Sequence, residues 1–176
     1  MNKSICPLLV LLLCFILPQF SSGQSEIRFF SGLGISKDVD YSLGIDYSFN
    51  FFFDDKSKFN FGTHIGVYYN QFNEPLLATD KQIYFRLGLQ LKYRILKKIW
   101  VRGDLGTHRP IKKENYFFND SQGNPVQDTN LGKHTYISPS IEYSINEMIN
   151  CFIIYNVAFE DMLDMNTVSL GVLIVL

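Results

Sequence analysis

The stretch from Ile83 to Ile95 decides the fold, and it reads Ile-Tyr-Phe-Arg-Leu-Gly-Leu-Gln-Leu-Lys-Tyr-Arg-Ile. Every odd-numbered residue in it is apolar or aromatic, whereas the even-numbered residues are arginine, lysine, glutamine, tyrosine or glycine. Successive side chains of a β-strand point to opposite faces of its sheet, while those of a helix repeat about every 3.6 residues. The stretch therefore predicts a strand with one apolar and one polar face.

The same alternation recurs along the chain and predicts an all-β protein. Its eight strands of about ten residues, the length a tilted strand needs to cross a membrane, cover residues 26–35, 41–52, 58–70, 82–95, 99–108, 134–145, 149–159 and 167–176. The connections after the second, fourth and sixth strands are short, whereas 71–81 and 109–133 are long. This asymmetry is typical of an eight-stranded antiparallel up-and-down transmembrane β-barrel. Pro139 cannot donate to a strand ladder, so it predicts a bulge or a rim position.

The composition excludes several classes of protein. Of the 176 residues, 47% are hydrophobic and 19% are charged, and the net charge is −1. A chain this apolar can bury a core, which argues against disorder. It also lacks the basic surface that a nucleic-acid partner requires. Its length suits one domain.

The N-terminal segment has the pattern of an export signal. A lysine near the start is followed by an apolar run, Ile5 to Leu17, and then by the small residues Ser21 and Gly23. The run is shorter than the roughly 20 residues of a spanning helix. We therefore expect residues 1–23 to be a cleaved signal peptide and residues 24–176 to form the barrel domain. An uncleaved anchor is the alternative.

Volume and charge indicate that the apolar face points outward. An eight-stranded barrel is just wide enough to be filled by its inward side chains, and this chain has 16 Phe and 10 Tyr. The apolar face of the predicted strands carries no charged residue, and an Arg or Lys at the lipid midplane costs about 2–4 kcal/mol. A soluble barrel with the faces reversed is the alternative.

The polar face then lines a narrow lumen, where we expect a network of opposite charges. Its members are Glu26, Arg28, Asp46, Arg86, Lys92, Arg94, Arg102, Asp104 and Glu142. Nearly balanced charges in a narrow space prefer to pair, which favours a closed plug over an ion path. Arg102-Gly103-Asp104 also spells an adhesive tripeptide, but such a motif acts from a loop tip and this one lies inside a predicted strand.

The pattern resembles the small eight-stranded outer-membrane barrels of the OmpX and OmpA transmembrane-domain type, and most of all the short barrel-domain proteins of Bacteroidetes. The residues that carry the resemblance are Leu43-Gly44, Phe61-Gly62, Leu87-Gly88, Leu105-Gly106, Leu170-Gly171, and Pro139 followed by Ile141 and Tyr143. The resemblance implies a place in the outer membrane of a Gram-negative bacterium, contact with its lipid and lipopolysaccharide, and structural or binding roles. It also implies that the barrel-assembly machinery reads the last strand through Val168, Leu170, Val172, Ile174 and Leu176.

The long connection 109–133 is the first candidate for function, because loops above about 12–15 residues are often functional. It begins with a basic and aromatic cluster formed by Arg109, Lys112, Lys113, Tyr116, Phe117 and Phe118. Such a cluster could hold lipopolysaccharide phosphates or a partner protein. The alternative is a strand extension whose aromatic residues pack on the rim.

Catalysis has little support in the sequence. The histidines are His64, His108 and His134, and the last two flank the long connection. Barrel enzymes that modify lipid A pair a rim histidine with a serine, and neither of these is followed by one two residues on. A metal site needs three or four converging ligands, and no such spacing is present.

We therefore predict a non-catalytic outer-membrane barrel without a metal or cofactor. Its outer loops, chiefly 109–133, would contact lipopolysaccharide or a protein partner. Three alternatives stay open: a narrow channel for small or apolar solutes, a lipid A-modifying enzyme, and a soluble barrel that carries an apolar ligand.

Overall fold

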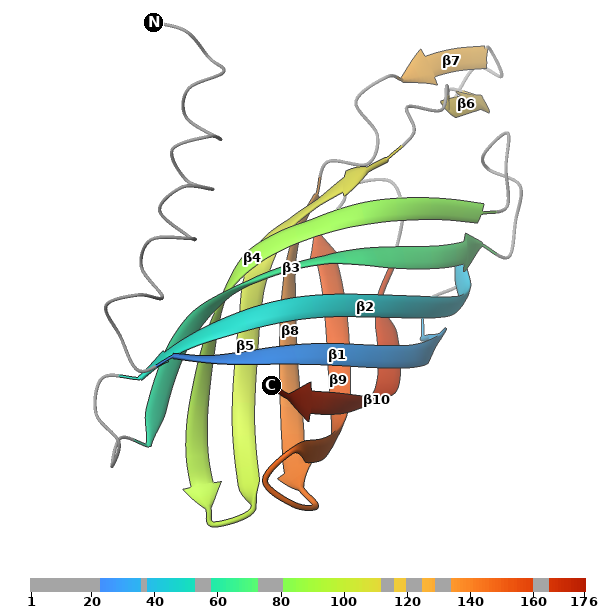
Figure 1. The fold of residues 1–176 in the computed structure, drawn as a ribbon. Coiled ribbons are helices and arrows are strands. Elements are labelled where there is room, and N and C mark those ends of the chain that lie inside the picture. The colour runs from blue at the N-terminus through green and yellow to red at the C-terminus, as the bar shows by residue number, and fades with distance from the viewer. Residues whose placement is uncertain are drawn as a thin grey trace, which may run out of the picture.

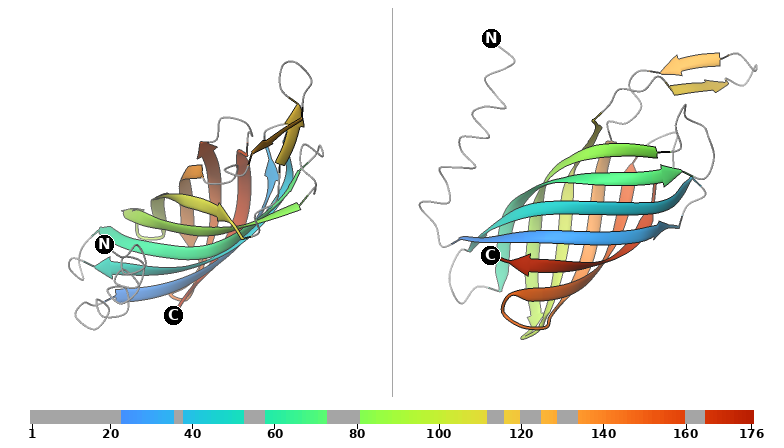
Figure 2. Two further views of the ribbon diagram at one scale, coloured as in Figure 1. Left: turned by 90° about the horizontal axis from the view of Figure 1, so that it is seen from above. Right: turned by 45° about the vertical axis from the view of Figure 1, so that its right-hand side comes forward.

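The computed structural model describes residues 23–35, 38–52, 58–72, 81–111, 116–119, 125–128, 134–159 and 165–176. Eight long antiparallel strands of this part of the chain close into a barrel (Figures 1 and 2). They are β1 (Gly23–Gly34), β2 (Val39–Phe52), β3 (Phe59–Phe72), β4 (Lys81–Leu96), β5 (Ile99–Pro110), β8 (His134–Ser144), β9 (Ile149–Phe159) and β10 (Thr167–Val175). The order β1-β10-β9-β8-β5-β4-β3-β2 joins neighbours in sequence and pairs the first strand with the last. The predicted up-and-down barrel is confirmed.

Burial alternates along each strand as the sequence predicts. In β4, Leu87, Leu89 and Leu91 are about half exposed, at 48%, 50% and 51%, whereas Arg86, Gln90 and Lys92 between and beside them are 3% exposed or less. The apolar face therefore points outward and the polar face lines the lumen. Among the described residues, no helix is long and apolar enough to span a membrane.

Pro139 occupies neither a bulge nor a rim. It lies in the middle of β8, points outward and is paired with Gly103 of β5. The β8–β9 register is the same on both sides of it, from Ile137 opposite Val157 to Ser140 opposite Ile154. The prediction was wrong because a missing N–H interrupts the ladder to one neighbour without inserting a residue into the strand.

A second, two-stranded sheet lies within the long connection between β5 and β8 (Figure 1). It pairs β6 (Tyr116–Asn119) with β7 (Pro125–Asp128) in antiparallel register. Sequence reasoning did not predict these short strands, because four residues are too few to show an alternation.

The barrel has two distinct rims. The short-turn rim carries the β4–β5 turn at Lys97 and Lys98 and the β8–β9 connection at 145–148. The long-loop rim lies at the opposite end, where β5 ends at Pro110 and β8 begins at His134. The small β6–β7 sheet stands beyond that second rim (Figure 2).

Candidate functional site

The lumen contains a network of buried ion pairs, called the charge network below. Its cations are Arg28, Arg86, Lys92 and Arg102, and its anions are Glu26, Asp46, Asp104 and Glu142. Each of the eight is 3% exposed or less. Five strands supply them, β1, β2, β4, β5 and β8, so the network ties distant walls of the barrel together.

Arg102 is the centre of this network. Its Nε donates to Asp104 Oδ1 at 2.6 Å, and its Nη1 lies 3.2 Å from Glu26 Oε2 and 3.7 Å from Glu142 Oε1. Its Nη2 donates to Ser48 and to the amide oxygen of Gln90. A guanidinium has five donors in a fixed fork, which is why one arginine can serve so many acceptors at once.

Three other cations complete the pairing, and one of them, Arg86, lies 3.6 Å from Asp46. Lys92 Nζ lies 2.7 Å from Glu26 and 2.8 Å from Glu142, and Arg28 Nη2 lies 2.9 Å from both Asp46 and Asp104. Every carboxylate of the network therefore meets at least two cations within 4 Å. Such pairing offsets the cost of removing these charges from water.

One predicted member stands apart from the charge network. Arg94 is half-buried, and its guanidinium carbon lies 5.3 Å from the centre of the Trp100 ring. Lys92 Nζ lies 5.6 Å from the same ring. Trp100 is therefore held by cation–π contacts at the edge of the network, next to the short-turn rim.

Glycine is required where the backbone passes close to the network. A methyl group added to Gly66 would collide with the Asp46 carboxylate and with the backbone carbonyl of Ile45. On the outward face, by contrast, nothing lies within 4 Å of a methyl group placed at Gly103. Other inward glycines make room for rings: Gly44 lies against Phe30 and Gly171 against Phe152.

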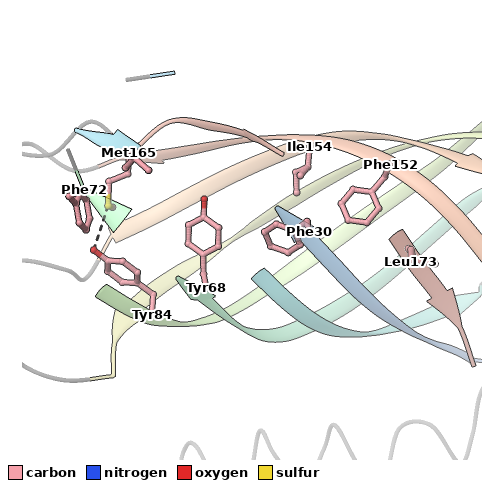
Figure 3. Close-up of a cluster of buried hydrophobic side chains, with 9 residues drawn as sticks. Phe30, Tyr68, Phe72, Tyr84, Phe152, Ile154, Met165 and Leu173 are labelled. Atoms are coloured by element: carbon pink, nitrogen blue, oxygen red, sulfur yellow. Dashed lines mark hydrogen bonds between the residues drawn. The ribbon is translucent and has the colours of Figure 1, made fainter. Parts of the chain in front are cut away.

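Besides the charge network and other buried polar side chains, such as Asn70, Asn156 and Thr167, the lumen holds an apolar and aromatic cluster. Its buried side chains are Phe30, Val39, Tyr68, Phe72, Tyr84, Phe152, Ile154, Met165 and Leu173 (Figure 3). Figure 3 shows the labelled side chains spaced along the barrel from Phe72 and Met165 to Leu173. The hydroxyls are satisfied: Tyr68 bonds Thr167 Oγ1 at 2.8 Å, and Tyr84 donates to Gln82 Oε1 at 2.9 Å.

Arg86 contacts both the charge network and the aromatic side chains of the lumen. Its guanidinium carbon lies 4.3 Å from the ring centre of Tyr136 and 5.3 Å from that of Tyr68. On its other side Nη1 lies 3.6 Å from Asp46. A guanidinium can pack against aromatic rings and form an ion pair at the same time. Arg86 therefore stays paired where the charge network borders the aromatic side chains.

The three histidines lie inside the barrel close to this boundary. His108 is stacked between Tyr136 and Tyr68, with ring centres 4.3 Å and 5.3 Å away and interplanar angles of 17° and 14°. His134, its partner across the β5–β8 pair, lies edge-on at 4.9 Å. His64 bonds the hydroxyl of Tyr136.

The histidine cluster is enclosed by the barrel wall. All three histidines are 3% exposed or less and face rings rather than the outer surface. In the described part of the chain, no group of three or more His, Cys, Asp or Glu is placed to hold a metal ion. Sequence reasoning placed His108 and His134 at the rim but could not foresee that they meet, since the β5–β8 register sets that contact.

The other predicted site residues lie as follows. Arg109 is exposed on the outward face near the end of β5, whereas Lys112 and Lys113 lie outside the described residues. Tyr116, Phe117 and Phe118 lie on β6. Arg102 and Asp104 of the adhesive tripeptide are buried in the charge network. The last strand turns Val168, Leu170, Val172, Ile174 and Leu176 toward the outward face.

No protein-family model matches this chain, and no curated protein matches its sequence. Solved structures match its fold. The outer-membrane protein Ail of Yersinia pestis in a phospholipid bilayer nanodisc gives a TM-score of 0.57 at 14% identity, over 88% of this chain and 100% of that one. Ail in complex with the heparin analogue sucrose octasulfate gives 0.57 at 13% identity, over 89% and 100%. A de novo designed transmembrane β-barrel gives 0.54 at 7% identity, over 87% and 95%.

The chain is a transmembrane β-barrel of eight strands. Identities this low show the fold alone, because one barrel fold serves many functions. The likeness is to small outer-membrane barrels in general. Membership of the OmpX and OmpA type, or of a Bacteroidetes family, stays a prediction.

Proposed function

We propose that this protein is a non-catalytic integral protein of the outer membrane of a Gram-negative bacterium. It is exported by residues 1–23, which lie outside the described part of the chain except for Gly23 at the start of β1. The observation that carries the proposal is the combination of an apolar outer wall with a lumen filled by paired charges and packed rings. Such a barrel is an anchor, and its function resides in what it holds at its rims.

The proposed orientation places the long-loop rim at the cell surface. Outer-membrane barrels have short periplasmic turns and longer extracellular loops. Residues 109–133 then form the largest extracellular connection, and the β6–β7 sheet lies within it. Assembly in this orientation would depend on the last strand, β10, as the signal for the assembly machinery.

Lipopolysaccharide is the proposed contact at that rim. Arg109 is exposed and points to the lipid side, and Lys81, at the start of β4, is also exposed there. Cations at this level face the phosphates of lipopolysaccharide, with which arginine forms bidentate hydrogen bonds. The binding of a sulfated sugar by Ail, a barrel of the same size, supports a polyanion as the ligand class. The proposal also includes a protein partner at the 109–133 loop.

Two experiments test the proposal. Membrane fractions would be run on SDS gels with and without boiling; a closed outer-membrane barrel should migrate faster when unboiled. Purified protein would then be titrated with lipopolysaccharide, comparing Arg109→Gln with Lys58→Gln at the short-turn rim. We expect weaker binding only for Arg109→Gln. Recovery of the protein in the soluble fraction without a heat shift would refute the membrane anchor.

The geometry favours neither a channel nor an enzyme. A continuous ion path would have to cross the charge network, where each carboxylate already meets two cations. A lipid A-modifying site would need a reactive side chain that faces the outer leaflet, whereas His108 and His134 face the lumen. The paired charges and stacked rings therefore support the anchor.

A further inference from the structure

A cavity opens at the short-turn rim, at the end of the barrel remote from the 109–133 loop. Its volume is about 790 Å³. The β4–β5 turn and the β8–β9 connection border it, together with the ends of β1 and β3. The Glu26–Lys92 ion pair also lines it. The cavity therefore begins where the charge network ends.

Amide side chains give this cavity hydrogen-bonding capacity. Gln24, Asn60, Asn146 and Asn150 all line it. Asn60 is only 3% exposed, and its Oδ1 has no hydrogen-bond partner among the described residues. A buried carbonyl oxygen without a hydrogen-bond partner is destabilising, because it has lost its bonds to water. A ligand with an O–H or N–H group would supply the missing donor.

The charged side chains around the cavity favour a negatively charged ligand. Lys97 and Lys98 are exposed on the β4–β5 turn, where Lys98 Nζ also lies 6.0 Å from the centre of the outward Tyr143 ring, and Glu147 of the β8–β9 connection lines the same cavity. The ammonium group of Lys92 is already paired with Glu26 and Glu142. The two turn lysines outnumber the one exposed carboxylate of the lining, so the mouth carries a net positive charge at its edge.

We propose that this cavity binds a carboxylated amino sugar, the chemistry of the periplasmic cell-wall polymer. Such a sugar has hydroxyl and amide N–H donors for Asn60 and a carboxylate for Lys97 and Lys98. Inorganic phosphate or a simple carboxylate offers acceptors for the lysines, but in its ionised form it has few or no donors for a carbonyl oxygen. The inference rests on the proposed outer-membrane orientation, which puts the short-turn rim in the periplasm.

The chain carries its own reporter for this site. Trp100 is the single tryptophan of the sequence. It is half-buried and lines the cavity. A ligand that enters the cavity should change the surroundings of the indole and hence its fluorescence.

The test is a titration of the detergent-purified protein with a soluble muropeptide, a disaccharide that bears the lactyl carboxylate and stem peptide. We expect a saturable change in Trp100 emission. The double variant Lys97→Gln/Lys98→Gln should raise the Kd at least fivefold. The matched control is Lys58→Gln, which removes one exposed lysine from the same rim but outside the cavity lining; it should leave the Kd within twofold.

Further probes separate the two parts of the proposed chemistry. A neutral chitin disaccharide should bind at least fivefold more weakly than the muropeptide, because it lacks the carboxylate. Asn60→Leu should also weaken muropeptide binding, with the heat shift on SDS gels showing that the variant has folded. The inference is overturned if the muropeptide gives no saturable change, if inorganic phosphate gives an equal one, or if Lys58→Gln weakens binding as much as the double variant.

Failure of the muropeptide inference can be distinguished from failure of the proposed membrane-anchor function. A protein that shifts on heating and fractionates with the outer membrane, yet gives no muropeptide response, retains the anchor role and loses only the cell-wall ligand. A protein absent from the membrane fraction refutes the anchor role whatever the titration shows.

Discussion

Replacing Arg102 with methionine should destabilise the barrel strongly, because this residue is the centre of the charge network. Methionine keeps most of the side-chain volume and removes the charge. The network contains four cations and four anions, so the variant leaves one buried negative charge in excess. Removing one partner of a buried pair typically costs about 3–5 kcal/mol.

The structure indicates that the destabilisation by Arg102→Met lies at the lower end of that range. Asp104 keeps Arg28 at 2.9 Å, and Glu26 and Glu142 keep Lys92 at 2.7 Å and 2.8 Å. No carboxylate loses every cation, so we expect a loss of about 3 kcal/mol in the free energy of unfolding. Asp104→Asn in the same chain should recover about 1 kcal/mol relative to the sum of the two single changes, since it restores charge balance between coupled residues.

The assay is denaturant unfolding in lipid vesicles, followed through Trp100 emission and through the heat-shifted band on gels. The matched control is Arg94→Met, which removes an arginine that is half-buried on Trp100 and outside the network. It should cost less than about 1 kcal/mol. Equal losses for the two variants would refute the argument that the charge network, rather than arginine packing in general, holds the lumen together.

In planar bilayers the protein should give no steady conductance, because paired charges and packed rings occupy its lumen; a stable open level in single-channel recordings would contradict this. Gly66→Ala should lower the yield of heat-shifted barrel, since the methyl group would collide with Asp46, whereas Gly103→Ala should leave the yield unchanged. Phe152→Ala should cost about 3 kcal/mol as a lumenal cavity, and Ile153→Ala, on the lipid side, should cost clearly less in the same unfolding assay. The reverse order would mean that the faces are inverted.

The strands could be predicted from the sequence because alternation is a local property. Each predicted strand overlaps an observed one, and the Ile83 to Ile95 stretch lies wholly within β4. The outward direction of the apolar face was also predictable, since a narrow interior cannot hold so many rings. Both inferences need only the period of the pattern and the volume of a small barrel.

Contacts across the lumen could not be predicted in the same way. Phe152 and Leu173 interrupt the polar face in the sequence, but only the closed barrel places them in one cluster with Phe30. Likewise, His108 meets His134 because the β5–β8 register pairs two residues at either end of a long connection. Side chains that share a lumen come from strands whose relative register is a tertiary property, and no periodicity records it.

The filled lumen limits the places where this barrel can bind a ligand. The outer wall of the barrel is apolar, and the interior is occupied by ion pairs, other buried polar side chains, and apolar and aromatic side chains. Removing any of these groups to make a binding site would leave a buried charge or a cavity, each of which costs several kcal/mol. The barrel can therefore bind ligands from water without losing stability only at its two rims. At the long-loop rim the exposed cations suit a phosphate-bearing surface. At the short-turn rim the unpartnered amide oxygen of Asn60, near two lysines, suits a ligand that both donates hydrogen bonds and carries negative charge. In the proposed orientation, the two rims would therefore contact different layers of the envelope.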